Sequence, residues 1–227
     1  MRQKSKSMNI AVKVAPNAKE LKMAADAGFR FIEVYTEKRF IARKYSDILN
    51  SFQLGYAVHA PLDCCDRSVV DFAASIGAKA MITHGFLSPE KLKELVEYAG
   101  QHGIAACIEN SGNHFPPHTI EDFFALKKRV PGIKMCLDIE HTIIHSQFPD
   151  IIAAVGKDIR HVHMSGYNPS KKNFHSPPFE NPAMVRKAVH ALKKAKFSGF
   201  LTAEMDEKYQ TPEIMKKARK FMESSVT

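Results

Sequence analysis

The stretch SPEKLKELVEYAGQHGIAACIEN, residues 88–110, contains one predicted helix followed by one predicted strand. Ser88 is a typical helix N-cap, and Pro89 suits the first helical position, where no backbone donor is needed. In residues 104–110, alternation places Ala105, Cys107 and Glu109 on one face and Ile104, Ala106 and Ile108 on the other. A small or polar inner face and an apolar outer face suit a narrow barrel with functional groups on its rim.

The same unit recurs along the chain. Strands are predicted at residues 9–15, 29–35, 55–60, 78–85, 104–110, 133–139, 159–165 and 199–205, with amphipathic helical stretches between them. The first helix is predicted to begin near Pro16 or Asn17 and to end at Gly28. In residues 133–139, Cys136 and Asp138 are predicted to face inward. Strands that alternate with helices indicate a parallel α/β sheet.

This pattern fits either an open doubly wound sheet or a closed barrel. Eight units in 227 residues, about 28 residues each, favour a (β/α)8 TIM barrel. No Gly-rich phosphate loop follows the first strand, so no nucleotide cofactor is expected. No shift in composition marks a second domain. We therefore predict a single, compact barrel domain over residues 1–227 with short loops, in which residues 1–7 form a flexible basic extension.

Composition is ordinary for a globular protein, with 44% hydrophobic and 25% charged residues. No apolar run approaches the roughly 20 residues that span a bilayer, and no signal-peptide core is present, so a cytoplasmic location without membrane contact is expected. The net charge of +9 suits phosphate-bearing partners, although lysine runs on amphipathic helices are usually just solvated. The four cysteines lack zinc-ribbon spacing, and no disulfide is expected.

Polar residues fall at or near the ends of six successive predicted strands, the third to the eighth. They are His59, His84, Glu109, Asp138, His163 and Glu204. In a barrel these strand ends converge on one mouth, where catalytic groups lie. Carboxylates held together there would repel one another unless a cation neutralised them. Mixed imidazole and carboxylate ligands predict a divalent metal, with zinc expected and manganese or iron as alternatives.

The segment CLDIEH, residues 136–141, places an acid and an imidazole three positions apart. On a helix this spacing would put Asp138 and His141 on one face. The preceding residues, however, are strand-like and follow the turn signal Pro131-Gly132. Asp138 is therefore predicted to close a strand, and His141 to lie in the loop beyond it, where it holds an additional metal or contacts the substrate.

These residues resemble the xylose isomerase-like TIM barrel superfamily, which includes sugar isomerases, epimerases and the endonuclease IV family. The resemblance rests on the order and spacing of VHAP (58–61), THG (83–85), IEN (108–110), LDIEH (137–141), HVHMS (161–165) and AEM (203–205). It implies a central metal site made by Glu109, Asp138, His163 and Glu204. It also implies that His59 and His84 match the further zinc position of the nuclease branch.

The resemblance assigns His141 and His175 to a third zinc of that branch, but the chain departs from the pattern here. Asn173 stands where the nucleases carry an aspartate, and an amide oxygen is a poorer ligand than a carboxylate. The usual Asn-Asp pair after the histidine of the seventh strand is absent, since Met164 and Ser165 follow His163. A third metal is therefore in question.

In the preferred interpretation, the resemblance implies a metal-dependent isomerase or epimerase of a sugar or sugar phosphate. The metal binds the substrate's oxygens, while Glu109 and Glu204 act as base and acid for proton transfer through an enediolate. Lys171 and Lys172 are candidates for contacting a substrate phosphate, and Asn110 for binding the substrate.

The alternative is a zinc-dependent endonuclease IV-like enzyme that cleaves abasic DNA. The positive charge and the retained histidines favour it. Asn173, the short loops and the lack of recognisable DNA-wedge residues weigh against it. A barrel that has lost catalysis is a third hypothesis, supported only by Asn173 and the Pro177-Pro178 loop. The particular substrate, the number of metals and the oligomeric state stay open.

Overall fold

The computed structural model describes residues 8–62, 64–112 and 115–227. Within these residues, eight parallel strands follow one another in chain order and close into a barrel, because β1 also pairs with β8. The strands are β1 (Asn9–Val14), β2 (Phe31–Tyr35), β3 (Gly55–His59), β4 (Ala80–Thr83), β5 (Ala105–Glu109), β6 (Lys134–Asp138), β7 (Ile159–Met164) and β8 (Phe200–Ala203). The predicted (β/α)8 barrel is confirmed. The extension predicted at residues 1–7 lies outside the described residues.

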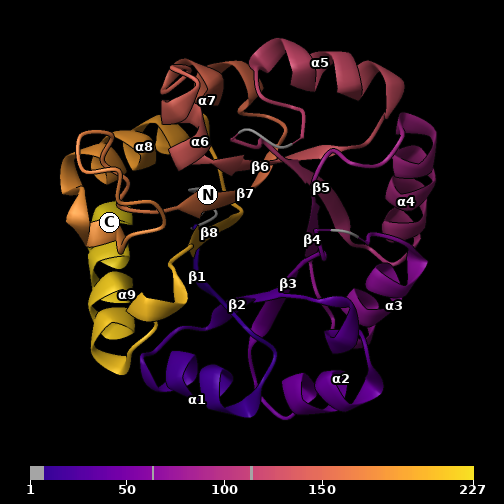
Figure 1. Cartoon of the computed structure of the whole chain (residues 1–227), viewed down its shortest axis with the longest axis horizontal. Coiled ribbons are helices and arrows are strands. Elements are labelled where there is room, and N and C mark those ends of the chain that lie inside the picture. Colours follow the sequence, from indigo (N-terminus) through magenta and orange to yellow (C-terminus); the bar gives the residue numbers. More distant parts are fainter. Residues whose placement is uncertain (1–7, 63, 113–114) are drawn as a thin grey trace, which may run out of the picture.

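Helices form a ring around the barrel (Figure 1). In the described part of the chain they are α1 (Ala18–Asp26), α2 (Arg43–Asn50), α3 (Arg67–Ser75), α4 (Pro89–Gln101), α5 (Ile120–Arg129), α6 (Ile139–Ile144), α7 (Asp150–Val155), α8 (Pro182–Lys194) and α9 (Pro212–Val226). Three short 3-10 helices are η1 (Lys38–Phe40), η2 (Pro178–Glu180) and η3 (Glu207–Tyr209). No helix among the described residues is both long and apolar enough to cross a membrane.

Two helices begin where the sequence predicts. The Ser88 hydroxyl accepts a hydrogen bond from the backbone N–H of Lys91, and the Asn17 side chain accepts one from that of Glu20. Both bonds satisfy a donor that the first helical turn leaves free. After α1, Gly28 has a φ of 94°, a conformation that favours glycine and ends the helix.

The barrel separates two apolar clusters. Inside it, a small cluster joins Ala57, Ala80, Ile82, Cys107 and Cys136. The larger cluster packs the outer strand faces, including Ile108 and Leu137, against the helices. The predicted inward face of β5 and β6 is therefore correct. All four cysteines are free, as expected. The small apolar cluster packs the inside of the barrel, and the predicted polar residues lie at or near the carboxyl ends of the strands.

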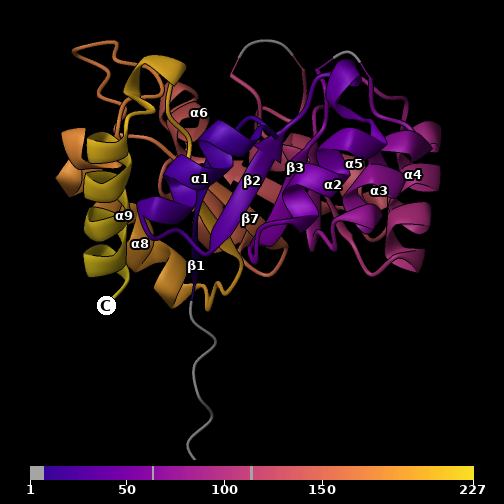
Figure 2. The same ribbon diagram turned by 90° about the horizontal axis from the view of Figure 1, so that it is seen from below.

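Figure 2 shows the start of β1 and the end of α9 at one end of the barrel, and the long loop after β7 at the other. The carboxyl ends of the strands therefore lie at the same end of the barrel as the long loop after β7. His84 and Glu204 directly follow β4 and β8, whereas His163 lies within β7, one residue before its end. Closure of the barrel brings the carboxyl ends of β3 to β8, which carry the six predicted polar residues, to one rim.

Candidate metal centre

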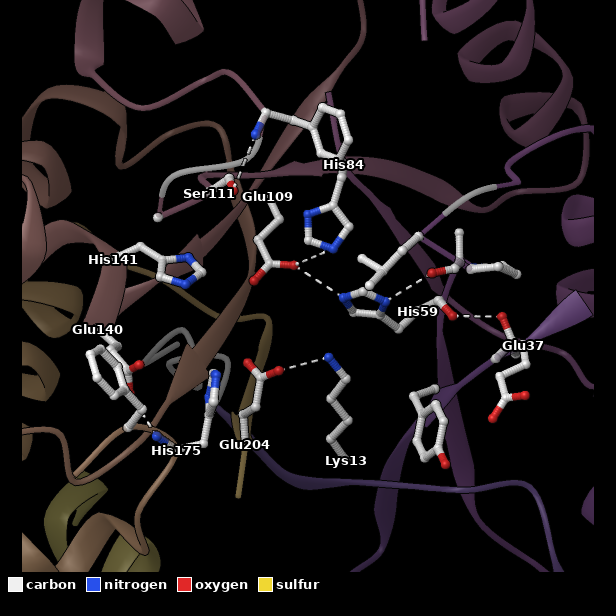
Figure 3. Close-up of a pocket in the computed structure, with 18 of the residues that line it drawn as sticks. Lys13, Glu37, His59, His84, Glu109, Ser111, Glu140, His141, His175 and Glu204 are labelled. Carbon is white, nitrogen blue, oxygen red and sulfur yellow. Dashed lines mark hydrogen bonds and ion pairs between the residues drawn. The ribbon is translucent and has the colours of Figure 1, made fainter. Parts of the chain in front are cut away.

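A cavity of about 970 Å³ opens at the carboxyl ends of the strands. Six of the residues predicted from the sequence line it: His59, His84, Glu109, His141, His175 and Glu204. Asp138 and His163 lie beneath them and are buried. Figure 3 shows Glu109 directed toward His59 and His84, and Glu204 facing Lys13. Most of the predicted site residues therefore surround one cavity.

One imidazole nitrogen lies among three carboxylates at the base of this cavity. His163 Nδ1 is 3.0 Å from Glu109 Oε1, 2.8 Å from Glu204 Oε2 and 3.9 Å from Asp138 Oδ2. One ligand atom from each of these four residues lies within 4.8 Å of the others. The structure thus brings together the four residues that the sequence resemblance assigns to a central metal.

The chemistry of this group fits a divalent metal. Glu204 Oε2 is buried and accepts no hydrogen bond, although it lies close to His163. A buried carboxylate oxygen without a hydrogen bond is unfavourable unless a cation contacts it. Burial opposes the charged form of Glu109 and Glu204, but His163 holds the pKa of both carboxyls well below their usual range. Ionised carboxylates and imidazole nitrogen are suitable zinc, manganese or iron ligands.

Glu109 also connects this group to a second one. Its Oε2 lies 3.0 Å from His59 Nε2 and 3.5 Å from His84 Nε2. His59, Glu109 and His163 form another group whose ligand atoms lie close enough to hold a metal. Burial lowers the pKa of His84 to about 4, so its ring is neutral at pH 7 and able to act as a ligand. One carboxylate therefore lies between two sets of imidazoles.

Three buried or half-buried titratable residues inside the barrel, Lys13, Glu33 and His161, were not predicted as site residues from the sequence. Glu33 on β2 accepts hydrogen bonds from Nε2 of His163 at 3.0 Å and pairs with Nε2 of His161 at 2.5 Å. Lys13 on β1 donates to Glu204 Oε1 at 2.7 Å. The strand-face alternation that identified Glu109 also places these residues inward. Glu33 and His161 lie in the middle of their strands, so the pattern of polar residues at strand ends does not include them.

The Glu33 contact determines how His163 faces the cavity. Because Nε2 of His163 donates to the Glu33 carboxylate, Nδ1 carries the lone pair in the neutral ring. Burial opposes the charged ring, but acids that include Glu204, Glu33 and Glu109 hold the pKa of His163 well above its ordinary value. Without a metal, Nδ1 therefore carries a proton and donates it to Glu109 Oε1 at 3.0 Å. A cation held by Glu109, Asp138 and Glu204 would displace this proton and accept the Nδ1 lone pair. Carboxylates of this kind orient the histidine ligands of metal sites and increase their basicity.

Asn110, predicted to bind the substrate, does not line the cavity and instead bonds to the backbone of Asp138. Its Nδ2 donates to the carbonyl of Asp138 at 3.0 Å, and its Oδ1 accepts from the N–H of Asp138 at 2.7 Å. This reciprocal pair ties the ends of β5 and β6 together. Nδ1 of His141 donates to the Asn110 carbonyl at 2.6 Å, which leaves His141 Nε2 as the acceptor nitrogen. Asp138 ends β6, as predicted from the sequence. The prediction that His141 lies in a loop is wrong, because His141 lies in α6.

The loop after β7 brings His175 to the cavity but not the other residues predicted there. Lys171 and Lys172 are exposed and do not line it. Asn173 Oδ1 accepts from the N–H of Asn168 at 2.7 Å, so this oxygen is engaged within the loop. The buried carboxylate of Glu140 accepts from the N–H of His175 at 2.9 Å. Among the described histidines and acids, His141 and His175 do not complete a third metal-binding group.

Comparison with known proteins gives a family and a fold. The family described as "Xylose isomerase-like TIM barrel" matches residues 21–225. No curated protein matches the chain. Among solved structures, D-allulose 3-epimerase from Methylomonas sp. is similar, with 16% identity and a TM-score of 0.72 over 97% of this chain and 98% of that chain.

Two further solved structures show the same fold. D-psicose 3-epimerase from Clostridium cellulolyticum H10 is 12% identical, with a TM-score of 0.70 over 96% of this chain and 99% of that chain. An AP endonuclease of family 2 from Brucella melitensis is 18% identical, with a TM-score of 0.66 over 91% of this chain and 96% of that chain. Epimerases and a nuclease thus share this barrel.

The substitution Glu33→Gln should lower metal affinity by about 10- to 100-fold. The amide would keep the size of the Glu33 side chain but lose the charge that fixes the His163 ring with Nδ1 toward the cavity. Titration calorimetry with Zn²⁺ and Mn²⁺ measures the effect. Glu37→Gln is the matched control, since Glu37 is exposed on the cavity rim. Equal affinities in the two variants would contradict the orienting role of Glu33.

A second prediction concerns pH in the chelator-treated protein. Burial raises the pKa of Asp138 to about 6, so between roughly pH 4 and 6 the folded state binds a proton that the unfolded state has lost. The contribution of Asp138 to stability therefore falls as pH rises through this window. The wild-type free energy of unfolding should fall by on the order of 1–3 kcal/mol relative to Asp138→Asn between these pH values.

Urea denaturation of both proteins at several pH values measures this difference, with Asp150→Asn as the exposed control. With metal bound at pH 7, the wild-type protein should instead be more stable than Asp138→Asn, because the substitution removes a charged ligand. A wild-type protein that gains stability over Asp138→Asn as pH rises without metal would refute the assignment.

Proposed function

This chain belongs to the xylose isomerase-like TIM barrel family, and we propose that it is a divalent-metal-dependent isomerase or epimerase of a sugar or sugar phosphate. The observation that carries this proposal is the arrangement around His163. Glu109 and Glu204 come from β5 and from the residue after β8, and both approach His163 Nδ1 at the base of the cavity. Two carboxylates with one cation between them suit proton transfer on a bound hydroxycarbonyl compound.

The metal-binding residues would be Glu109, Asp138, His163 and Glu204. A bound divalent cation would supply Lewis-acid polarisation of the substrate's oxygens, which makes the neighbouring C–H bond more acidic. Glu109 accepts a proton from the substrate carbon, and Glu204, which first takes up a proton from solvent in the cavity, returns one to the carbon. Lys13 donates to Glu204 Oε1 at 2.7 Å, which holds this carboxylate in position.

Lys13 is itself kept charged by its surroundings. Burial disfavours the ammonium, but Glu204 and Glu33 hold the pKa of Lys13 above its ordinary value. The ammonium lies 2.7 Å from Glu204 and 3.8 Å from Glu33, and it offsets part of the negative charge at the base of the cavity. Two solved structures named as sugar 3-epimerases share this fold and support the proposal at the level of the fold.

A second candidate is a metal-dependent phosphodiesterase that acts on abasic DNA. The specific observation in its favour is the position of His59 and His84, both near Glu109 Oε2. Two metal ions that share a carboxylate could stabilise the attacking and leaving oxygens of a phosphodiester. The engagement of Asn173 within its own loop argues against a complete three-metal site.

Deuterium exchange tests the first proposal. The metal-loaded protein, incubated in D2O with a panel of ketohexoses and pentulose phosphates, should place solvent deuterium on the carbon next to the carbonyl of its substrate. Glu109→Gln and Glu204→Gln should each lower the exchange rate by at least about a hundredfold, because each removes a proton-transfer group. NMR measures the exchange, and metal analysis of each variant separates loss of metal from loss of proton transfer.

Glu94→Gln, at an exposed position of α4 outside the cavity lining, is the control for this experiment and should retain exchange within about twofold, as expected for a surface residue. Exchange that persists in both Glu109→Gln and Glu204→Gln would rule out their proposed roles.

Nicking of an abasic-site duplex tests the second candidate. The isomerase proposal predicts no chelator-sensitive nicking at enzyme concentrations well below that of the DNA. Multiple turnover on the duplex, abolished by chelator and by His84→Asn, would instead favour the phosphodiesterase. An intact duplex of the same sequence is the substrate control.

A further inference from the structure

Large apolar side chains are exposed at three positions among the described residues: Leu62 at 64%, Phe174 at 45% and Phe124 at 37%. Leu62 and Phe174 both line the cavity above the candidate metal centre, whereas Phe124 on α5 does not. Single exposed apolar residues are ordinary on protein surfaces. Leu62 and Phe174 follow β3 and β7 on opposite sides of the mouth, and Phe115 and Ile144 also line the cavity. Apolar side chains exposed to a cavity are typical of a small-molecule site.

Two aromatic rings of the cavity lining, Phe174 and Phe115, are held in place by neighbouring rings. Phe174 stacks on Tyr167, with centroids 5.0 Å apart and planes inclined by 26°. Tyr167 is buried, and the Asn181 side chain donates to its backbone carbonyl at 2.7 Å. Phe115 packs edge-on against Phe86, with centroids 5.9 Å apart. Rings that are already ordered lose little conformational entropy when a ligand covers them.

The cavity changes character from its base to its rim. Its base is polar, with Glu109, Glu204 and Lys13, and its rim combines apolar side chains with the charged Glu37, Lys38 and Arg39. Among the rim cations, Arg39 pairs with Glu37 at 2.8 Å, which reduces the positive charge available to a phosphate. A volume of about 970 Å³ lies at the upper end of the roughly 300–1,000 Å³ typical of small-molecule sites. A free sugar would fill the polar base and leave the apolar side chains of the rim in water.

We propose that the substrate is a sugar derivative with an apolar aryl substituent. The sugar ring occupies the polar base, and the substituent lies against Phe174, whose ring is held at the rim by its stacking on Tyr167. This inference rests on the proposed function for the place of the sugar, whereas the apolar rim is an independent observation. Burial of an aryl group against ordered apolar side chains favours binding through the hydrophobic effect.

Matched glycosides test the inference by binding alone. Phenyl and methyl pyranosides of glucose and galactose have no free carbonyl, so the metal-loaded protein cannot isomerise them. Titration calorimetry should show the phenyl compound of at least one sugar binding about tenfold more tightly than its methyl counterpart. The double variant Leu62→Asn, Phe174→Asn should lose this preference.

Phe124→Asn is the matched control, because it replaces the third exposed apolar residue, which lies outside the cavity lining. It should retain the preference for the phenyl compound. The replaced side chains are exposed, so the fold of each variant should be intact, and circular dichroism checks this. Equal or undetectable binding of the phenyl compounds to the wild-type protein overturns the inference, as does a preference that survives in the double variant.

The outcomes also separate this inference from the proposed function. Absence of deuterium exchange on every sugar of the panel and on phenyl-substituted ketohexoses, with the phenyl preference intact, would overturn the isomerase proposal but leave the aryl-binding rim. Exchange on free sugars without any phenyl preference would do the opposite. If the double variant instead dissociates a dimer in light scattering and keeps wild-type glycoside binding, the rim is a contact between copies of the chain and the inference is wrong.

Discussion

The balance of buried charge around His163 is the constraint on which the upper end of the barrel depends. Its imidazole lies between Glu33 on one side and Glu109, Asp138 and Glu204 on the other. Buried carboxylates are costly unless paired and hydrogen-bonded, and breaking such a pair costs more than its formation gains. The His163 ring pairs with four carboxylates, each from a different strand or strand end. The barrel must therefore close with β2, β5, β6, β7 and β8 in the observed register for these charges to be compensated.

Sequence patterns predict the fold because each strand and helix carries its own local signals. Ser88 and Asn17 cap helices by bonds that span three residues, and the alternation in β5 and β6 shows directly which residues face inward. The candidate site follows in part from the same logic, since parallel strand ends must converge in a closed barrel. Residues at strand ends, such as Glu109 and Asp138, are consequently found from the sequence alone.

The remainder of the site depends on contacts between residues far apart in the chain. Glu33 and His163 are separated by 130 positions, and no local pattern indicates that one fixes the tautomer of the other. The role of Asn173 depends on the path of its loop, which directs the amide toward Asn168 and Ser176 rather than toward the cavity. Likewise, no local pattern indicates that Leu62 and Phe174, which follow β3 and β7 on opposite sides of the barrel, line the same cavity.

The reciprocal hydrogen bonds between Asn110 and the backbone of Asp138 have a consequence for how an ion would be received. They fix the spacing of the β5 and β6 ends, so the backbones that carry Glu109 and Asp138 are already in place before any ion arrives. The conformational cost of assembling that part of the ligand set is met during folding rather than during binding. Selectivity among cations then depends less on how far the strands can adapt and more on the ionic radius that this preorganised spacing accepts.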